Sequence, residues 1–383
     1  MSEKMTMRFS IPDPKTKEIV FENVLPSYDP GTLEQLKELS SKRKIVEDSV
    51  NKTRTVSEAI AREMNRGLTS ACEQDLYKLG QYIPLLVNLI HYIHKLGIES
   101  RKARWVSALK IRWSSALISP SLLHRKSPKF FQIDDIMFEL GMILFLYAVK
   151  LREKAMEFIS IDMVQSATLY REAAGVFHHL SHEVLPGLQP SLPMEKPAEV
   201  IPSVCSSLSL LCLAEGQAVT VKRAEEKGTS GSLLAKLHYG VTQLAGEANA
   251  LLLLSGECKD LSSRFLEYVS FLGALHELKS QKHLAECLAS EEQLGAAIGV
   301  LHRGLAAAAG RRSTAGEDTW RSIFRKETEE VSRRIDKYGR ENDFILRQKI
   351  PLETELPVPH GNKIVNLIPY SPTGWERELC FNF

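Results

Sequence analysis

Two histidines four residues apart are the first side chains in this sequence that could bind a metal ion. His178 and His182 occur in the stretch FHHLSHEVL, and side chains four apart lie on one face of a helix. A zinc site needs at least one further protein ligand. The stretch HEVLP is not an HExxH motif, and it places a proline in the next turn. Surface histidines are therefore the favoured interpretation, and a metal-dependent enzyme using His178 and His182 is left as an alternative.

A cysteine near the end of the sequence could carry a lipid. Cys380 is followed by Phe381, Asn382 and Phe383, which is the layout of a prenylation box with a geranylgeranyl-type last residue. Asn382 departs from the aliphatic residue that is usual at its position. The sequence thus predicts Cys380 as a prenylation site, with an ordinary frayed tail as the alternative. One prenyl chain gives only marginal, reversible membrane binding, so a second contact would be needed.

Motifs that bind phosphate or activate a serine do not occur in the sequence. It has no GxxxxGK[ST] loop, no GxGxxG turn after a strand and no GxSxG elbow. Basic clusters such as SRKARW lack interleaved aromatic residues, and the net charge of +2 creates no field that would attract nucleic acid. We therefore expect a non-enzymatic binding protein with no metal, no cofactor, no nucleic-acid partner and no small-molecule substrate.

The composition is that of a cytoplasmic protein with a full core. The chain has 383 residues, of which 44% are apolar and 25% charged. Its six cysteines include no CxxC pair, which indicates reduced thiols in the cytosol. The charged N-terminus has no apolar segment of a secretory signal, and the apolar run in DDIMFELGMILFLYAVKLREK is too short to span a bilayer. Any contact with a membrane would require a lipid, a surface or a partner.

Almost the whole sequence has the apolar periodicity of helices. Two segments with strand character, 6–12 and 18–25, come first. Helices are predicted over 31–68, 73–96, 101–118, 131–159, 162–184, 203–227, 231–256, 260–290, 291–309 and 317–340. The proline-rich stretch 185–202 interrupts them, and the last 40 residues contain five prolines. The sequence predicts an elongated all-α body of antiparallel helices, with a short N-terminal β element and a tail that lies back on the body.

Several stretches, which together span about 110–365, occur in the order known from one protein family. They are IRWSSAL, SATLYREAAGVFHHLSHEVLP, SLSLLCLAEGQAVTVKRAEEKG, GSLLAKLHYG and ENDFILRQKIPLETELP. The residues that carry the resemblance most clearly are Tyr170, Ala173, Ala174, Phe177, Leu213, Ala214 and Gln217. In these stretches the chain resembles the Bro domain (Bro-one domain) family of adaptors for ESCRT-III, the membrane-scission machinery.

The resemblance implies a fold, a partner and a place of action. The family fold is a curved helical body related to tetratricopeptide packing, which would make residues 1–370 a single Bro domain and 371–383 a tail with the prenylation box. This layout is similar to family members that consist of the domain alone. Bro domains capture the C-terminal amphipathic helix of an ESCRT-III subunit, the class-four charged multivesicular body protein, in a hydrophobic groove on the concave face. The implied function is endosomal and multivesicular-body sorting, in the cytoplasm and peripherally on endosomal membranes.

The same resemblance implies which residues form the groove. Its positions fall on Leu233, Leu237, Thr220, Arg223, Val164 and, after a shift of one residue, Val365. Leu233 and Leu237 are four apart on one helix and are expected to face outward, with core packing as the alternative. Arg223 suits an acidic peptide, whereas Thr220 stands where long family members have a large aromatic anchor. That loss of apolar area leaves open a second hypothesis: a Bro-domain scaffold that no longer binds ESCRT-III and engages another cytoskeletal or membrane partner.

Overall fold

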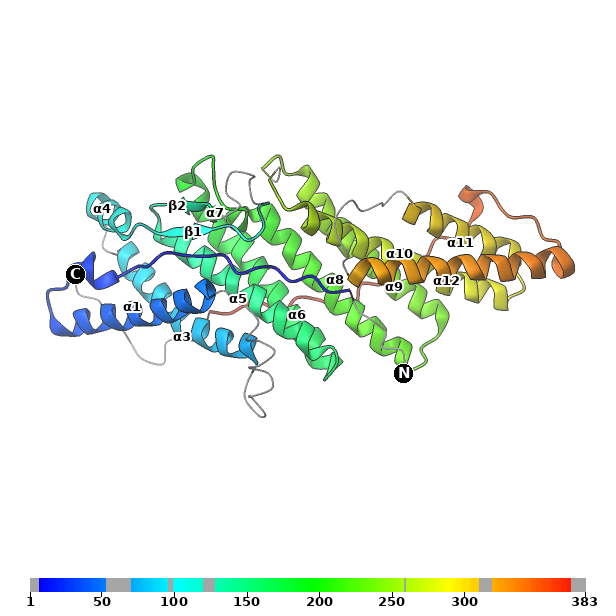
Figure 1. Ribbon diagram of the computed structural model, residues 1–383, viewed down its shortest axis with the longest axis horizontal. Coiled ribbons are helices and arrows are strands. Elements are labelled where there is room, and N and C mark those ends of the chain that lie inside the picture. Colours follow the sequence, from blue (N-terminus) through cyan, green and yellow to red (C-terminus); the bar gives the residue numbers. More distant parts are fainter. Residues whose placement is uncertain are drawn as a thin grey trace.

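The protein is an elongated row of helices packed side by side (Figure 1). The computed structural model describes residues 7–52, 70–95, 99–119, 128–257, 260–309 and 319–372. The helices are α1 (Pro30–Asn51), α3 (Ala71–Lys95), α4 (Glu99–Leu109), α5 (Ile136–Phe158), α6 (Met163–His179), α7 (Leu185–Leu188), α8 (Pro202–Glu226), α9 (Gly231–Leu254), α10 (Ser263–Ser290), α11 (Leu294–Ala309) and α12 (Thr319–Glu341). The elongated all-α architecture predicted from the sequence is confirmed.

Local signals explain where the central helices α6, α8 and α9 begin and end. The Asp162 carboxylate caps α6 by accepting hydrogen bonds from the backbone N–H groups of Val164 and Gln165, at 2.8 and 3.2 Å. Pro202 occupies the first turn of α8, where a missing N–H costs nothing. Gly228 follows α8 in the left-handed conformation, with φ of +73°, which reverses the chain into α9. Helices α8 and α9 are therefore antiparallel neighbours.

The apolar core has two parts. The larger extends from the N-terminal segment to α10, and the smaller joins the far ends of α10, α11 and α12. In the smaller part Leu294, Ala297, Ile298 and Leu301 are buried, and together they form an apolar stripe along α11. Helix α8 is long and apolar enough to cross a bilayer by length and composition, but 78% of its most apolar window is buried within the bundle. It is the central core helix.

A buried ion pair connects α5, α8 and α10. The Arg152 Nε donates to Glu215 Oε2 at 2.7 Å, and the Tyr268 hydroxyl donates to Glu215 Oε1 at 2.7 Å. Arg152 Nη1 also donates to the carbonyl of Phe9 at 2.7 Å, which anchors the N-terminal segment. Arg152 and Glu215 are both buried. Buried charges are tolerated only when they are paired and hydrogen-bonded in this way.

The small sheet lies later in the chain than the predicted strands. Strands β1 (Arg112–Ser114) and β2 (Phe130–Gln132) pair antiparallel, with Trp113 opposite Phe131. The N-terminal segment forms no strand of this sheet in the described residues, but it pairs with β1 through an isolated bridge from Thr16 to Trp113. The helix predicted over 101–118 is therefore wrong beyond Leu109. The chain extends there because the buried Trp113 ring donates its Nε1–H to Glu139 Oε2 at 2.6 Å, a contact that a continued helix would not make.

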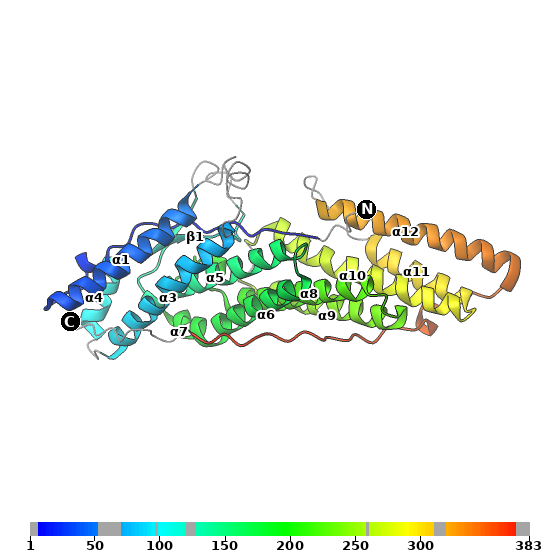
Figure 2. The same cartoon turned by 90° about the horizontal axis from the view of Figure 1, so that it is seen from below.

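The proline-rich stretch and the tail have the predicted character. Residues 185–202 form only the short α7 and isolated turns before α8 begins. After α12 the chain is mostly extended, and its last described part runs along α9 and α6 on one side of the molecule, opposite the N-terminal segment (Figure 2). The Asn362 N–H donates to the carbonyl of Lys236 at 3.0 Å, and the Ile368 N–H to that of Arg171 at 3.1 Å. The tail lies back on the body as far as residue 372.

Candidate functional site

Exposed apolar side chains gather on the side of the molecule formed by α6, the end of α8, the start of α9 and the tail. Val164 is 47% exposed, Leu233 40% and Ile364 44%. Thr220 is half-buried and Arg223 is exposed on the last turns of α8. We call these five residues the outer face. Helix α8 packs against both α6 and α9, so the outer face is one surface built by neighbouring helices.

The close approach of α6 and α8 depends on a glycine. A Cβ on Gly216 would lie 3.1 Å from the Cβ of Tyr170 and 3.6 Å from the carbonyl oxygen of Ala167. One turn further along α8, the Thr220 hydroxyl donates to the carbonyl of Gly216 at 2.9 Å. The hydroxyl proton of Thr220 is therefore satisfied within its own helix, and the position offers a partner little apolar area.

Two of the predicted groove residues do not face outward. Leu237 is only 4% exposed and Val365 only 9%, and both belong to the main core. The expectation that Leu237 points out beside Leu233 is wrong, because residues four apart on a helix differ by about 40° around its axis. That rotation turns Leu237 into the main core. In the tail, Ile364 is exposed where Val365 is not, so the exposed apolar side chain at this point lies one residue earlier than predicted.

Gln217, a residue of the resemblance, holds the outer face together. Its Nε2 donates to the carbonyl of Leu237 at 2.8 Å and to that of Asn362 at 2.9 Å. Its Oε1 accepts from the backbone N–H of Ile364 at 3.1 Å. This buried amide thus bonds α8 to α9 and to the tail at once. It determines which side of the tail is exposed.

The histidine pair considered from the sequence forms no three-ligand group. The rings of His178 and His182 lie 4.0 Å apart, but His182 Nδ1 is engaged by the Ser181 hydroxyl at 2.7 Å and by the carbonyl of His178 at 3.0 Å. Partial burial lowers the pKa of His178, and the neighbouring His182 lowers it further. Among the described residues, neither histidine belongs to a group of three donors that could share an ion.

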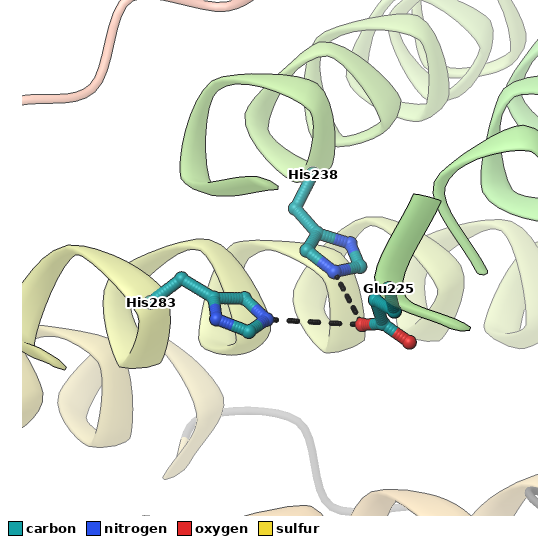
Figure 3. Close-up of side chains that lie close together, drawn as sticks. All are labelled: Glu225, His238 and His283. Atoms are coloured by element: carbon teal, nitrogen blue, oxygen red, sulfur yellow. Dashed lines mark hydrogen bonds and ion pairs between the residues drawn. The ribbon is translucent and has the colours of Figure 1, made fainter. Parts of the chain in front are cut away.

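A different set of side chains does meet this condition, on the opposite side of α8. Glu225 of α8, His238 of α9 and His283 of α10 point toward one another (Figure 3). His238 Nε2 lies 3.0 Å and His283 Nε2 3.7 Å from the same oxygen, Glu225 Oε1. The two imidazole rings are stacked, with their centroids 5.5 Å apart. We call Glu225, His238 and His283 the inner cluster.

The protonation of the inner cluster follows from its burial. Burial lowers the pKa of His238 to about 4, and the hydrogen bond that His238 donates to Glu225 only partly opposes this. Burial acts to raise the pKa of Glu225, but hydrogen bonds with His238 and His283 outweigh it and hold that pKa below its usual range. At neutral pH the cluster therefore contains a carboxylate and a neutral His238, both able to donate electron pairs.

The inner cluster lines a cavity of about 460 Å³ between α8, α9, α10 and α12. The lining includes five acidic side chains, Glu215, Glu225, Glu286, Glu327 and Glu330, and five basic ones, Lys222, Lys279, Lys282, Lys326 and Arg334. The charges of the cavity are therefore balanced.

Little in the sequence points to the inner cluster. His276 and His283 are seven apart, which places them on one face of the predicted helix 260–290. No sequence pattern connects these histidines with Glu225 or His238, since the residues of the cluster meet only when three helices pack.

Cys380, the predicted lipid site, lies in residues 373–383, outside the described part of the chain.

The fold is an elongated helical domain, and exposed apolar residues lie on its outer face. The BRO1-like domain family model matches residues 43–379, and the chain belongs to this family. The human (Homo sapiens) "BRO1 domain-containing protein BROX" is 26% identical over 337 residues, which cover 82% of this chain and 79% of that protein. BROX of Xenopus tropicalis is 25% identical over 338 residues and covers 82% of this chain and 78% of that protein. The resemblance found in the sequence is confirmed.

Solved structures share the fold. A structure titled "ALIX BRO1 CHMP4C complex" matches with a TM-score of 0.67 and 18% identity over 95% of each chain. Another, "Structure basis for endosomal targeting by the Bro1 domain", matches with a TM-score of 0.59 and 18% identity over 96% of this chain and 93% of the other. At these identities the matches establish the fold.

Proposed function

We propose that this protein is a non-enzymatic adaptor that binds the C-terminal amphipathic helix of an ESCRT-III subunit of the class-four type, and that it acts in endosomal sorting. The main support for this proposal is the outer face, where Val164, Leu233 and Ile364 are exposed on neighbouring elements of a BRO1 domain. The ALIX BRO1 domain with the same fold has been solved in complex with CHMP4C, which supports this class of partner.

The chemistry of the outer face suits a helix with an apolar stripe and acidic flanks. Exposed aliphatic side chains from α6, α9 and the tail supply contacts for residues spaced three and four apart on a partner helix. The exposed guanidinium of Arg223 adds a positive charge at the end of α8. Leu237 and Val365 would support this surface from beneath, since both are buried in the core under it.

The test is the affinity of the purified protein for a peptide of the ESCRT-III C-terminal helix, measured by calorimetry. Leu233→Asp places a charge in the apolar contact and should weaken binding by about 2 kcal/mol or more, roughly 30-fold. Leu253→Asp is the matched control, because Leu253 is 71% exposed near the other end of the same helix. We expect its affinity to stay within about twofold of wild type.

Equal affinities of wild type and Leu233→Asp, with helicity unchanged by circular dichroism, would remove the outer face from the binding site. If the wild-type protein binds no such peptide, the second hypothesis takes its place: a scaffold that engages another cytoskeletal or membrane partner. Thr220 favours that alternative because its hydroxyl replaces apolar area on the outer face. Attachment to endosomal membranes through a prenyl group on Cys380 stays a prediction from the sequence.

A further inference from the structure

We propose that the inner cluster of Glu225, His238 and His283 binds one divalent transition-metal ion, with zinc as the cation that best fits its two imidazoles and one carboxylate. This set of nitrogen and oxygen donors is typical of zinc sites that keep one position open. The site is independent of the outer face, which lies on the other side of α8.

The convergence of the three donors carries the proposal. Two ring nitrogens, His238 Nε2 and His283 Nε2, approach one carboxylate oxygen, Glu225 Oε1, at 3.0 and 3.7 Å. All three donor atoms lie within 4.8 Å of one another. Tetrahedral zinc with bonds of about 2.0–2.1 Å places its ligand atoms about 3.3 Å apart. The observed separations bracket that value, so small side-chain movements would complete the site.

The second ring nitrogen of each histidine has its own partner. His283 Nδ1 lies 3.0 Å from Glu286 Oε2, and His238 Nδ1 lies 2.9 Å from His276 Nδ1. In the metal-bound form each ring takes the tautomer with its proton on Nδ1, instead of on the Nε2 that otherwise donates to Glu225, so that His283 donates to a carboxylate and His238 to a neighbouring imidazole. Both Nε2 lone pairs then point into the cluster. Ligand histidines are held and made more basic in this way at known metal sites.

The surroundings of the inner cluster also allow a cation to bind. The three donors come from three different helices, whose packing determines their relative positions. The five acidic and five basic side chains around the cavity leave no net positive charge that would repel the ion. Since the donors line this cavity, water from it can serve as the fourth ligand.

The experiment measures zinc bound to the full-length protein after treatment with a chelator. Titration calorimetry and elemental analysis should find one zinc ion per chain, and cobalt should give the visible absorption of a tetrahedral site. His283→Ala and Glu225→Gln each remove a ligand and should abolish stoichiometric zinc. Glu286→Gln removes only the partner of a ligand and should weaken zinc binding by about 10–100-fold. His283 is only partly buried, so its replacement spares the core.

His178→Ala is the control, because it removes a histidine from the pair that forms no three-donor group. Its zinc affinity should equal that of wild type. The proposal is overturned if the wild-type protein binds no zinc, if His283→Ala and Glu225→Gln bind it as wild type does, or if His178→Ala is the variant that loses it. Circular dichroism of each variant shows whether a loss comes from unfolding, and His283→Ala decides the case if Glu225→Gln is unfolded.

Discussion

The two sides of α8 differ in how strongly their side chains interact with other helices. The outer face includes the exposed Arg223 and the half-buried Thr220, whose hydroxyl bonds within its own helix. The inner side carries Glu215 and Glu225, which meet side chains from α5, α9 and α10. Substitutions on the outer face can therefore change a partner while the fold persists. On the inner side, one replacement leaves buried polar groups of other helices without a partner.

The largest effect should come from breaking the buried ion pair on the inner side. Arg152→Met leaves the Glu215 carboxylate buried without its cation, which should lower the free energy of unfolding by about 3–5 kcal/mol. Urea unfolding followed by circular dichroism measures this loss.

Lys363→Ala provides the comparison for Arg152→Met. Lys363 pairs with Glu247 between the tail and α9, where both side chains are well exposed. Its removal should cost less than about 1 kcal/mol, because water and salt screen such pairs. Equal losses for the two variants would show that burial does not make the Arg152–Glu215 pair more important for stability than an exposed ion pair.

The fold could be predicted from the sequence wherever local periodicity decides it. The boundaries of α6, α8 and α9 follow from Asp162, Pro202 and Gly228, whose effects act within one turn. The end of α4 could not be predicted, because the extended chain at Trp113 depends on a bond to Glu139, a residue on another helix. Helix propensity depends on residues that are near in the sequence, so it cannot predict a contact with another helix.

The family resemblance predicted the exposure of some residues of the candidate site and failed for others. Val164 and Leu233 are exposed as the resemblance implied. Leu237 was misplaced because the step of about 40° from Leu233 turns it into the core, and Val365 because the register of the tail depends on the hydrogen bonds of Gln217. The inner cluster could not be predicted, since His238 and His283 meet Glu225 only through the packing of three helices.

A middle-sized effect is expected where the tail lies on α6. A Cβ on Gly175 would collide with the carbonyl of Ile368, which is backbone and cannot rotate away. Gly175→Ala should therefore displace the tail and lower the free energy of unfolding by about 1–3 kcal/mol. Hydrogen exchange of residues 362–370 should become faster, while exchange in α10 should stay slow. This result would show that the tail is part of the outer face in solution.

Gly246→Ala is the matched control for this substitution. Gly246 is also inside a long helix, α9, but a Cβ there meets no atom within 4 Å. Alanine should stabilise the protein by about 0.5–1 kcal/mol, since it restricts the unfolded chain and favours the helix. Faster exchange of the tail in Gly246→Ala as well would mean that the contact at Gly175 is not what holds the tail.

The smallest effect tests whether the outer face can be improved without touching the inner side. Thr220→Leu replaces a hydroxyl that donates within α8 by apolar area, on the surface between Val164 and Leu233. If a partner helix covers this position, the added burial should tighten binding by about 1 kcal/mol, roughly fivefold. Thr328→Leu, at a half-buried position on α12 whose hydroxyl donates to its own helix, should leave affinity unchanged.

Weaker binding by Thr220→Leu would have one of two causes, because extra apolar area against an apolar stripe does not by itself lower affinity. Either the partner recognises the hydroxyl of Thr220, or the larger leucine side chain collides with the partner. Thr220→Val separates these two cases: it keeps the size and shape of threonine while removing the hydroxyl, so it binds weakly only if the hydroxyl is recognised.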